Sequence, residues 1–131
     1  MTIARISASG RELRAAERDD GVTAVLVTAA GPRYSDEVAA FVRRMASTTL
    51  PSVAVVSGQC DASALAVLAS VGLGFVADDV VVSVDAGTVL ALGLTSSLPA
   101  AVGGAPARGL LFAESVDAAA LRSCGLARSG D

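Results

Sequence analysis

Residues 50–69, LPSVAVVSGQCDASALAVLA, predict a strand, a turn and a helix in immediate succession. Pro51 marks a break, and residues 52–57 (SVAVVS) are apolar and rich in β-branched side chains, which predicts a buried strand. Residues 58–61 (GQCD) predict a tight turn. Residues 62–71 are apolar and mostly small, so we expect a helix that packs closely against a sheet.

Two more segments predict strands on either side of this unit. Residues 23–28 (TAVLVT) and residues 80–84 (VVVSV) are apolar, β-branched and bounded by turn-forming residues. Both faces of these strands are apolar, as parallel strands covered by helices require. Strands and helices alternate along the chain, which predicts an α/β fold of mostly parallel strands covered by helices.

Capping signals indicate where the first two helices begin. Ser9 and Glu12 form a capping-box pattern, which predicts a short helix from this point. Ser35 predicts the start of a second helix, because Asp36 and Glu37 in its first turn complement the helix dipole.

Toward the C-terminus, residues 106–113 and 116–124 predict two further helices, the second capped by Ser115. Residues 88–94 are a short apolar run whose period does not distinguish a helix from a strand. Neither a repeat nor a change of composition divides the chain. We therefore expect a single domain over residues 1–131.

The composition indicates a globular domain with a core of Ala, Val and Leu. Of the 131 residues, 53% are hydrophobic, 18% are charged and only 3% are aromatic. No apolar run reaches the roughly 18 residues of a membrane-spanning helix, and the N-terminus lacks the apolar segment of a signal peptide. Cys60 and Cys124 are expected to be free thiols in a reducing compartment, with Cys60 a small buried hydrophobe. We therefore expect a cytoplasmic protein.

The charged residues exclude several classes of function. The net charge is -3, and the ten basic residues are all Arg, with Arg43 and Arg44 the only adjacent pair. Such a pattern lacks the basic stripe of a nucleic-acid-binding protein. The chain has no His and no Lys, so catalysis by Ser-His-Asp, Cys-His or Ser-Lys groups cannot operate within it. Two cysteines without histidine do not make a structural zinc site, and we expect no metal.

Four segments, by their order and spacing, resemble the crotonase (enoyl-CoA hydratase/isomerase) family. Residues 19–35 (DDGVTAVLVTAAGPRYS) are similar to the strand and loop that carry the family's first oxyanion-hole amide. Residues 50–69 are similar to its second strand, glycine turn and buried helix. Residues 77–84 and the loop after them resemble the next strand and loop, and residues 115–127 (SVDAAALRSCGLA) resemble a short helix ending in Gly-Leu. The resemblance implies the core of the fold that crotonases share with Clp protease subunits.

The chain departs from both of these relatives. It is about half as long as a usual crotonase, and the opening hairpin and the C-terminal helices, which close the acyl-CoA site and mediate trimer packing, are expected to be absent. Residues 58–63 (GQCDAS) also resemble the Gly-Gln turn of Clp protease subunits, where a serine nucleophile follows. Here one extra residue precedes Ser63 and no histidine is present to activate it, so we do not expect a protease.

The resemblance implies where an oxyanion hole would lie. Crotonases hold a thioester carbonyl between two backbone amides that stabilise the enolate, and these amides would belong to Asp36 and Ser63. An aspartate side chain beside an oxyanion is electrostatically unfavourable unless it points away, and an acidic helix start explains Asp36 equally well. In the same loop, Arg33 and Tyr34 are candidate ligand-binding residues, Arg33 for a CoA phosphate.

The two glutamates with which family hydratases activate water are missing. Ala66 stands at the first position, and residues 86–89, where the second would fall, contain no carboxylate. Losing a general acid or base lowers the rate about 10²–10⁴-fold, so ordinary hydration is not expected. Asp61 and Asp85 are the remaining candidate catalytic residues near this site. The preference of Asp for turns and helix starts explains both without catalysis.

Two functions remain open. The one that we favour is a non-catalytic accessory subunit, which forms a homo-oligomer (a trimer or hexamer) or joins a larger crotonase-type partner, because a chain without its covering helices exposes apolar surface. The alternative is an atypical acyl-CoA thioester enzyme with an oxyanion hole and an Asp acid/base. Its ligand would be a coenzyme A thioester, and no other cofactor is expected. Neither function involves nucleic acid or a membrane.

Overall fold

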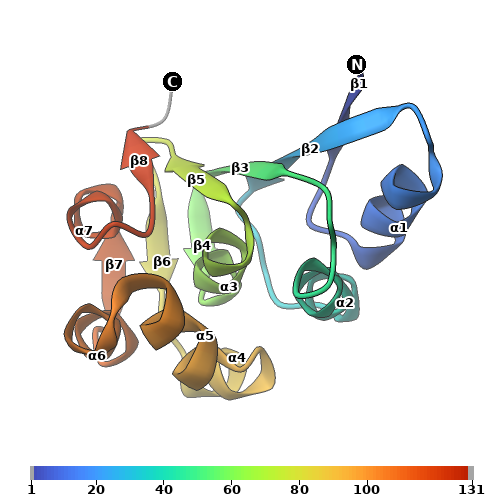
Figure 1. The fold of residues 1–131 in the computed structure, drawn as a ribbon. Coiled ribbons are helices and arrows are strands. Elements are labelled where there is room, and N and C mark those ends of the chain that lie inside the picture. The colour runs from blue at the N-terminus through green and yellow to red at the C-terminus, as the bar shows by residue number, and fades with distance from the viewer. Residues whose placement is uncertain (1, 130–131) are drawn as a thin grey trace.

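A computed structural model describes residues 2–129 of the chain (Figure 1). Its main element is a five-stranded sheet in the order β1-β2-β3-β5-β8, and all four pairs of neighbouring strands are parallel. The predicted α/β fold with mostly parallel strands is therefore confirmed. The strands are β1 (Thr2–Ile6), β2 (Val22–Ala30), β3 (Ser52–Ser57), β5 (Leu73–Val76) and β8 (Arg128–Ser129).

A second, three-stranded sheet has the order β4-β6-β7. In it β4 (Gln59–Asp61) runs parallel to β6 (Val81–Ser83), which pairs antiparallel with β7 (Ser115–Asp117). Gly58 is the single residue between β3 and β4, and its φ of 78° is readily available only to glycine. The chain can therefore leave the first sheet and enter the second within one residue.

The helices α1 (Gly10–Arg18), α2 (Asp36–Met45) and α3 (Ser63–Ser70) lie on the same side of the five-stranded sheet (Figure 1). The first six residues of α3 are all buried, so its small side chains allow the predicted close packing. Four further helices are described, and no helix within residues 2–129 is long and apolar enough to cross a membrane. These four helices are α4 (Ala86–Ala91), α5 (Leu94–Val102), α6 (Gly104–Leu111) and α7 (Ala118–Ser123).

Two of the three predicted helix caps, Ser9 and Ser35, are confirmed. Ser9 Oγ accepts a hydrogen bond from the Glu12 amide at 3.4 Å, at the start of α1. Ser35 Oγ accepts from the Val38 amide at 3.2 Å, at the start of α2. These bonds satisfy backbone donors that the first turn of a helix leaves free.

Several predicted boundaries were wrong. Most of the turn expected over residues 58–61 is strand β4, because pairing with β6 extends its backbone. The helix expected over residues 116–124 is shorter, because β7 takes its first residues and Asp117 rather than Ser115 caps α7. The ambiguous residues 88–94 belong mainly to α4, whose cap is Asp85.

Four elements were not predicted at all: strands β1, β5 and β8, and helix α5. Strands β1 and β5 are short, and each is held in the sheet by parallel pairing with a strand remote in sequence. Helix α5 contains Pro99, a residue that lowers helix propensity because it lacks an N–H group. Local sequence patterns do not reveal elements that depend on distant partners.

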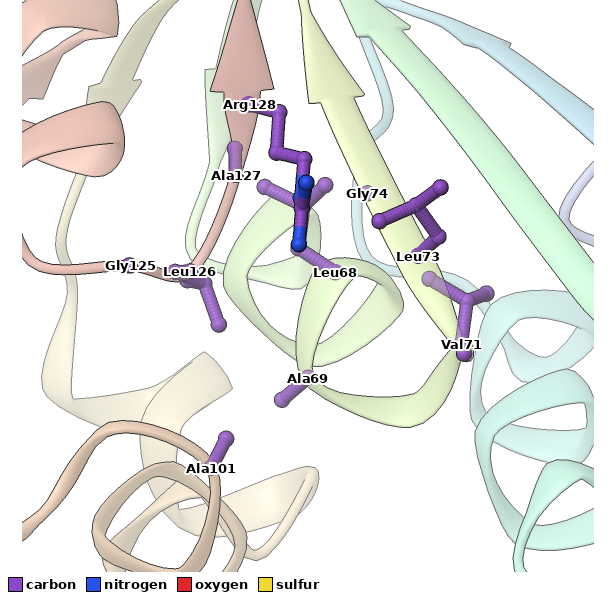
Figure 2. Close-up of a pocket in the computed structure, with 11 residues that line it drawn as sticks. Leu68, Ala69, Val71, Leu73, Gly74, Ala101, Gly125, Leu126, Ala127 and Arg128 are labelled. Atoms are coloured by element: carbon purple, nitrogen blue, oxygen red, sulfur yellow. The ribbon is translucent and has the colours of Figure 1, made fainter.

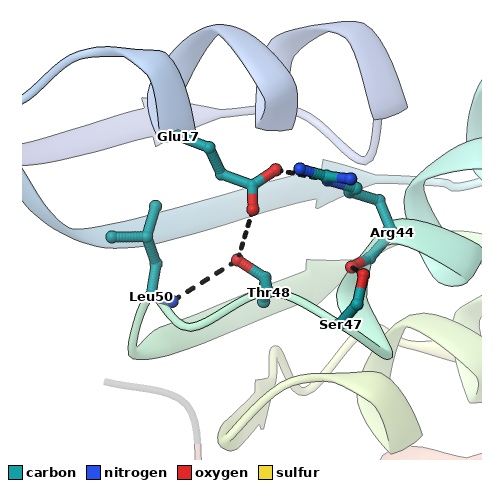
Figure 3. Close-up of polar contacts among 5 residues, drawn as sticks. All are labelled: Glu17, Arg44, Ser47, Thr48 and Leu50. Atoms are coloured by element: carbon teal, nitrogen blue, oxygen red, sulfur yellow. Dashed lines mark hydrogen bonds and ion pairs between the residues drawn. The ribbon is translucent and has the colours of Figure 1, made fainter.

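Helices α1 and α2 pack with almost no space between their backbones. A Cβ atom added to Gly10 would lie 2.6 Å from the Cβ of Ala40 and 3.0 Å from its carbonyl carbon. At the other end of α1, the Glu17 carboxylate accepts from Arg44 Nε at 2.6 Å and from Thr48 Oγ1 at 3.1 Å (Figure 3). The contact thus extends from the start of α1 to the loop before β3.

The close approach at Gly10 predicts a sharp effect of a single methyl group. Gly10→Ala should lower the free energy of unfolding by about 1–3 kcal/mol, because Ala40 and its backbone would have to shift. The matched control is Gly109→Ala in α6, where nothing lies within 4 Å of the added Cβ; it should be neutral or stabilising by up to about 1 kcal/mol. Urea unfolding followed by circular dichroism measures both, and equal stabilities would contradict the packing.

Candidate functional site

The loop after β2 and the turn after β3 meet at the carboxyl ends of these strands. The Gly31 amide donates to the Ser57 carbonyl oxygen at 2.7 Å, and the Asp61 amide donates to the Pro32 carbonyl oxygen at 3.2 Å. Gly31 and Gly58 have φ angles of 57° and 78°, and a Cβ at Gly58 would lie 3.5 Å from the Gly31 nitrogen. The two segments that the family resemblance singled out therefore lie side by side.

The side chain of Asp61 bridges these two segments. Its Oδ2 accepts from the Tyr34 amide at 2.7 Å, and its Oδ1 accepts from the Ser63 amide at 2.9 Å. The second bond is the usual Asx turn, in which an Asp binds an amide two residues later. The first spans 27 residues and fixes the loop. We call this arrangement the Asp61 bridge: the Asp61 carboxylate with the Tyr34 and Ser63 amides.

The Asp61 bridge brings together some of the predicted site residues and separates others. The Ser63 amide and an amide of the loop bind the same carboxylate, but this loop amide is that of Tyr34 and not that of Asp36. Asp36 is the first residue of α2, two positions further along, and its side chain is exposed. The role of the Tyr34 amide had no sequence signal, because any residue supplies a backbone N–H group. Tyr34 itself is 43% exposed, and Arg33 is exposed beside it.

Ser63 presents a second unusual group at the start of α3. The residue is fully buried, and its Oγ has no hydrogen-bond partner among the described residues. A buried hydroxyl without a partner costs about 1–3 kcal/mol. The Ser63 amide is thus bound by the Asp61 carboxylate, whereas the Ser63 hydroxyl forms no hydrogen bond with the described residues.

Asp85 lies close to the same turn but acts as a helix cap. Its carboxylate accepts from the Thr88 amide at 2.9 Å. The hydrogen bonds with Thr88 are the main reason why the pKa of Asp85 lies below its usual value, and the Ala62 amide contributes less. Since Asp61 pairs in register with Ser83, the two predicted catalytic carboxylates follow neighbouring strands β4 and β6. Both already serve as acceptors for backbone amides.

Ala66, where the family resemblance predicts that a glutamate would stand, lies in an apolar setting. It is 1% exposed and lines a hollow of about 380 Å³ between α2, α3 and α5. Val42 and Ala100 form other parts of the wall, and the only polar side chains in it are Ser70 and Ser97. No group there could transfer a proton to or from water near neutral pH.

Cys60 is a structural residue of this region. It is 1% exposed, and burial raises the pKa of its thiol to about 11. At neutral pH it therefore carries almost no thiolate, the form that acts as a nucleophile. The expectation of a small buried hydrophobe agrees with this environment, and Cys124 is the other free thiol.

A separate hollow of about 290 Å³ lies at the opposite end of the main sheet, beside the start of β5 (Figure 2). Leu68, Gly74 and Leu126 line it, and Arg128 extends across it. It contains no carboxylate, thiol or hydroxyl side chain, so it does not compete as a candidate active site. Within residues 2–129 no three His, Cys, Asp or Glu side chains are grouped to hold a metal ion.

Solved structures with the same arrangement of elements are known. An enoyl-CoA hydratase/isomerase from Pseudoalteromonas atlantica matches 93% of this chain with a TM-score of 0.74 and 25% sequence identity. Proteins named for the same activity, from Acinetobacter baumannii (TM-score 0.77, 16% identity) and Mycobacterium abscessus (0.72, 20%), also match 93% of it. The chain has the crotonase fold.

The match is one of structure, and it covers only part of each solved chain. This chain spans 57%, 62% and 58% of the three solved chains, respectively. No family model matches the sequence, and no curated protein matches it. The resemblance inferred from four sequence segments is thus confirmed at the level of the fold, and the function rests on the site itself.

The Asp61 bridge predicts how the loop responds when the carboxylate is removed. Asp61→Ala should lower the free energy of unfolding by about 1–3 kcal/mol, because two amides lose a charged acceptor. It should also abolish the protection of the Tyr34 amide against hydrogen exchange. Asp117→Ala is the matched control, since Asp117 accepts from the single amide of Ala120 at 2.9 Å. It should cost about 1 kcal/mol and leave Tyr34 protected. Unchanged exchange at Tyr34 in Asp61→Ala would contradict the bridge.

Proposed function

We propose that this chain is a non-catalytic crotonase-fold subunit that assembles with further copies of itself. The observation that carries the proposal is the Asp61 bridge, in which a carboxylate of the chain itself occupies the amide of Ser63. An oxyanion hole works only if its donors are free to meet the charge that develops on the substrate. Here one of the two expected donors, the Ser63 amide, already holds a permanent negative charge, and so does the Tyr34 amide of the loop.

The negative charge of the Asp61 carboxylate at these amides is unfavourable for thioester chemistry. A second negative oxygen about 4 Å from the Asp61 carboxylate would be repelled by about 1 kcal/mol in water and about 4 kcal/mol near a protein surface. Displacing the carboxylate instead would break its bonds to Tyr34 and Ser63. An enolate is therefore destabilised at the place where active crotonases stabilise it.

The residues around the bridge support the same conclusion. Ala66 offers no proton-transferring group, and Asp85 is used as the cap of α4. Replacing a general acid or base costs about 10²–10⁴-fold in rate, so two such losses together with the occupied amide leave no effective route to hydration.

The alternative is an atypical acyl-CoA enzyme, and one feature favours it. The apolar hollow beside Ala66 has about 380 Å³ of space, and the buried Ser97 Oγ in its wall has no partner among the described residues. An acyl chain could enter such a hollow. In that case Asp61 would have to leave the amides and act as the acid/base.

Acyl-CoA titration separates the two proposals. We expect the wild-type chain to bind neither acetyl-CoA nor crotonyl-CoA in calorimetry and to hydrate crotonyl-CoA no faster than buffer does. Asp61→Ala, which frees the Tyr34 and Ser63 amides, should bind acetyl-CoA measurably, with an affinity at least about 10-fold above the detection limit that the wild type does not reach, a difference of about 1.4 kcal/mol. Asp117→Ala should not. Wild-type turnover that Asp61→Asn abolishes would establish the enzyme instead.

Assembly is supported by large apolar side chains left on the surface. Phe112, directly after α6, is 84% exposed, and Leu90 on α4 is 71% exposed. Exposed side chains of this size are common in surfaces that another chain covers. A trimer or hexamer of this chain is the assembly we propose, and a larger crotonase-fold partner is the alternative.

Light scattering coupled to size exclusion tests the assembly. We expect the wild-type chain to be oligomeric and Phe112→Ser to shift it toward the monomer, because the variant removes the largest exposed apolar group. Ile3→Ser, at a 61% exposed position on β1, is the control and should not change the mass. A wild-type chain that is monomeric at all concentrations would exclude the homo-oligomer and leave the complex with a larger crotonase-fold partner as the alternative. If this monomer also bound no crotonase-fold enzyme, assembly would be refuted.

A further inference from the structure

The outer surface between α1 and α2 carries two adjoining hollows. They have volumes of about 280 Å³ and 200 Å³, and they share Arg14 and Ala40, so they form one groove. Its floor is low because Gly10 and Ala40 meet there without larger side chains. We call this surface the α1–α2 groove. The groove is separate from the Asp61 bridge, because it is lined neither by Asp61 nor by the residues whose amides bind Asp61.

Five of the ten arginines of the chain line the α1–α2 groove. Arg11, Arg14 and Arg18 are spaced three and four residues apart along α1, a spacing that places them on one face of a helix. Arg43 and Arg44 add to them from the end of α2. A chain with a net charge of -3 therefore concentrates half its positive charge on one surface, which the scattered sequence positions concealed.

Little of this positive charge is neutralised within the groove. Arg44 is paired with Glu17, whose second oxygen accepts from Thr48 (Figure 3). Among residues 2–129, Arg14, Arg18 and Arg43 have no carboxylate within 4.0 Å. All three side chains belong to exposed residues, so their donors face the solvent.

Among the described residues, the one acidic residue that lines the groove is Glu37, and its carboxylate already accepts a hydrogen bond. Glu37 Oε1 accepts from Ser9 Oγ at 2.7 Å. This bond is the main cause that lowers the pKa of Glu37, while burial opposes it and the charge of Arg11 assists it. Glu37 therefore compensates Arg11 at one end and leaves the positions from Arg14 onward free for an anion.

We propose that the α1–α2 groove binds a soluble polyphosphate, meaning a chain of phosphate groups such as that of a nucleoside triphosphate. The guanidinium group matches phosphate oxygens with two parallel hydrogen bonds. Arg11 and Arg18 lie seven positions apart, about 10 Å at a rise of 1.5 Å per residue, a length suited to several linked phosphates. This binding site is independent of the function proposed for the crotonase fold.

Calorimetric titration with sodium tripolyphosphate at low ionic strength tests the proposal. We expect saturable binding to the wild-type chain that weakens as salt is added, because exposed charges are screened. Arg14→Ala combined with Arg43→Ala should weaken binding about 10-fold or more, since each removes charge-assisted hydrogen bonds. Arg108→Ala combined with Arg128→Ala removes the same charge elsewhere and should change the affinity less than about 2-fold, as expected for distant charges under screening.

Two further titrations define the ligand. Binding of ATP but not of adenosine would support recognition through the phosphates. Absence of tripolyphosphate binding up to millimolar concentration would overturn the proposal, as would an equal loss of affinity in the two double variants. Poly-glutamate that competes as strongly as tripolyphosphate would also overturn it, because the groove would then be an unspecific surface for anions. Circular dichroism of the variants confirms that they are folded.

Discussion

The carboxylate of Asp61 connects the loop after β2 with the segment after β3, two segments that backbone hydrogen bonds also join. The loop after β2 has to turn away from the sheet at Gly31, and the chain after β3 has to turn into the second sheet at Gly58. Both turns leave backbone amides that no strand or helix satisfies. Asp61 satisfies one from each segment, at 2.7 Å and 2.9 Å, and so fixes their relative position.

The same interaction is the basis of the non-catalytic function that we propose. In a crotonase fold, amides at these two segments are the natural place for an oxyanion, because the start of α3 and the loop after β2 converge there. A permanent carboxylate stabilises the loop by the same electrostatic attraction that would otherwise stabilise a transition state. Under the proposed function, the bridge therefore orders the loop and does not bind a substrate carbonyl. Ala66 agrees with this proposal. Its side chain is buried in the core, whereas a glutamate at this position would need water or a polar partner around its charge.

Small side chains explain much of the remaining architecture. Only 3% of the residues are aromatic, so the core cannot be filled by large rings. Instead the backbones approach closely, as at Gly10 against Ala40 and along the buried face of α3. Close helix packing then brings the surface side chains of α1 and α2 together, and arginines from two separate segments come to line one groove.

The sequence by itself determined the features that depend on near neighbours along the chain. The caps at Ser9 and Ser35, the strands around residues 23–28 and 52–57, and the buried helix after Gly58 all follow from patterns within a few residues. The absence of His and Lys excluded whole classes of catalysis without any coordinates. Four segments in the right order were also sufficient to indicate the crotonase fold.

Only the tertiary structure decided the features that depend on distant partners. Strands β1, β4 and β5 exist because remote strands offer them hydrogen bonds, and a short segment has no such signal of its own. The pairing of the Tyr34 amide with Asp61 joins residues 27 positions apart, and any residue at position 34 would have supplied the donor. The arginines of α1 and α2 likewise become one surface only after the helices pack. Local propensity fixes caps and strands, whereas sites are made by contacts between segments.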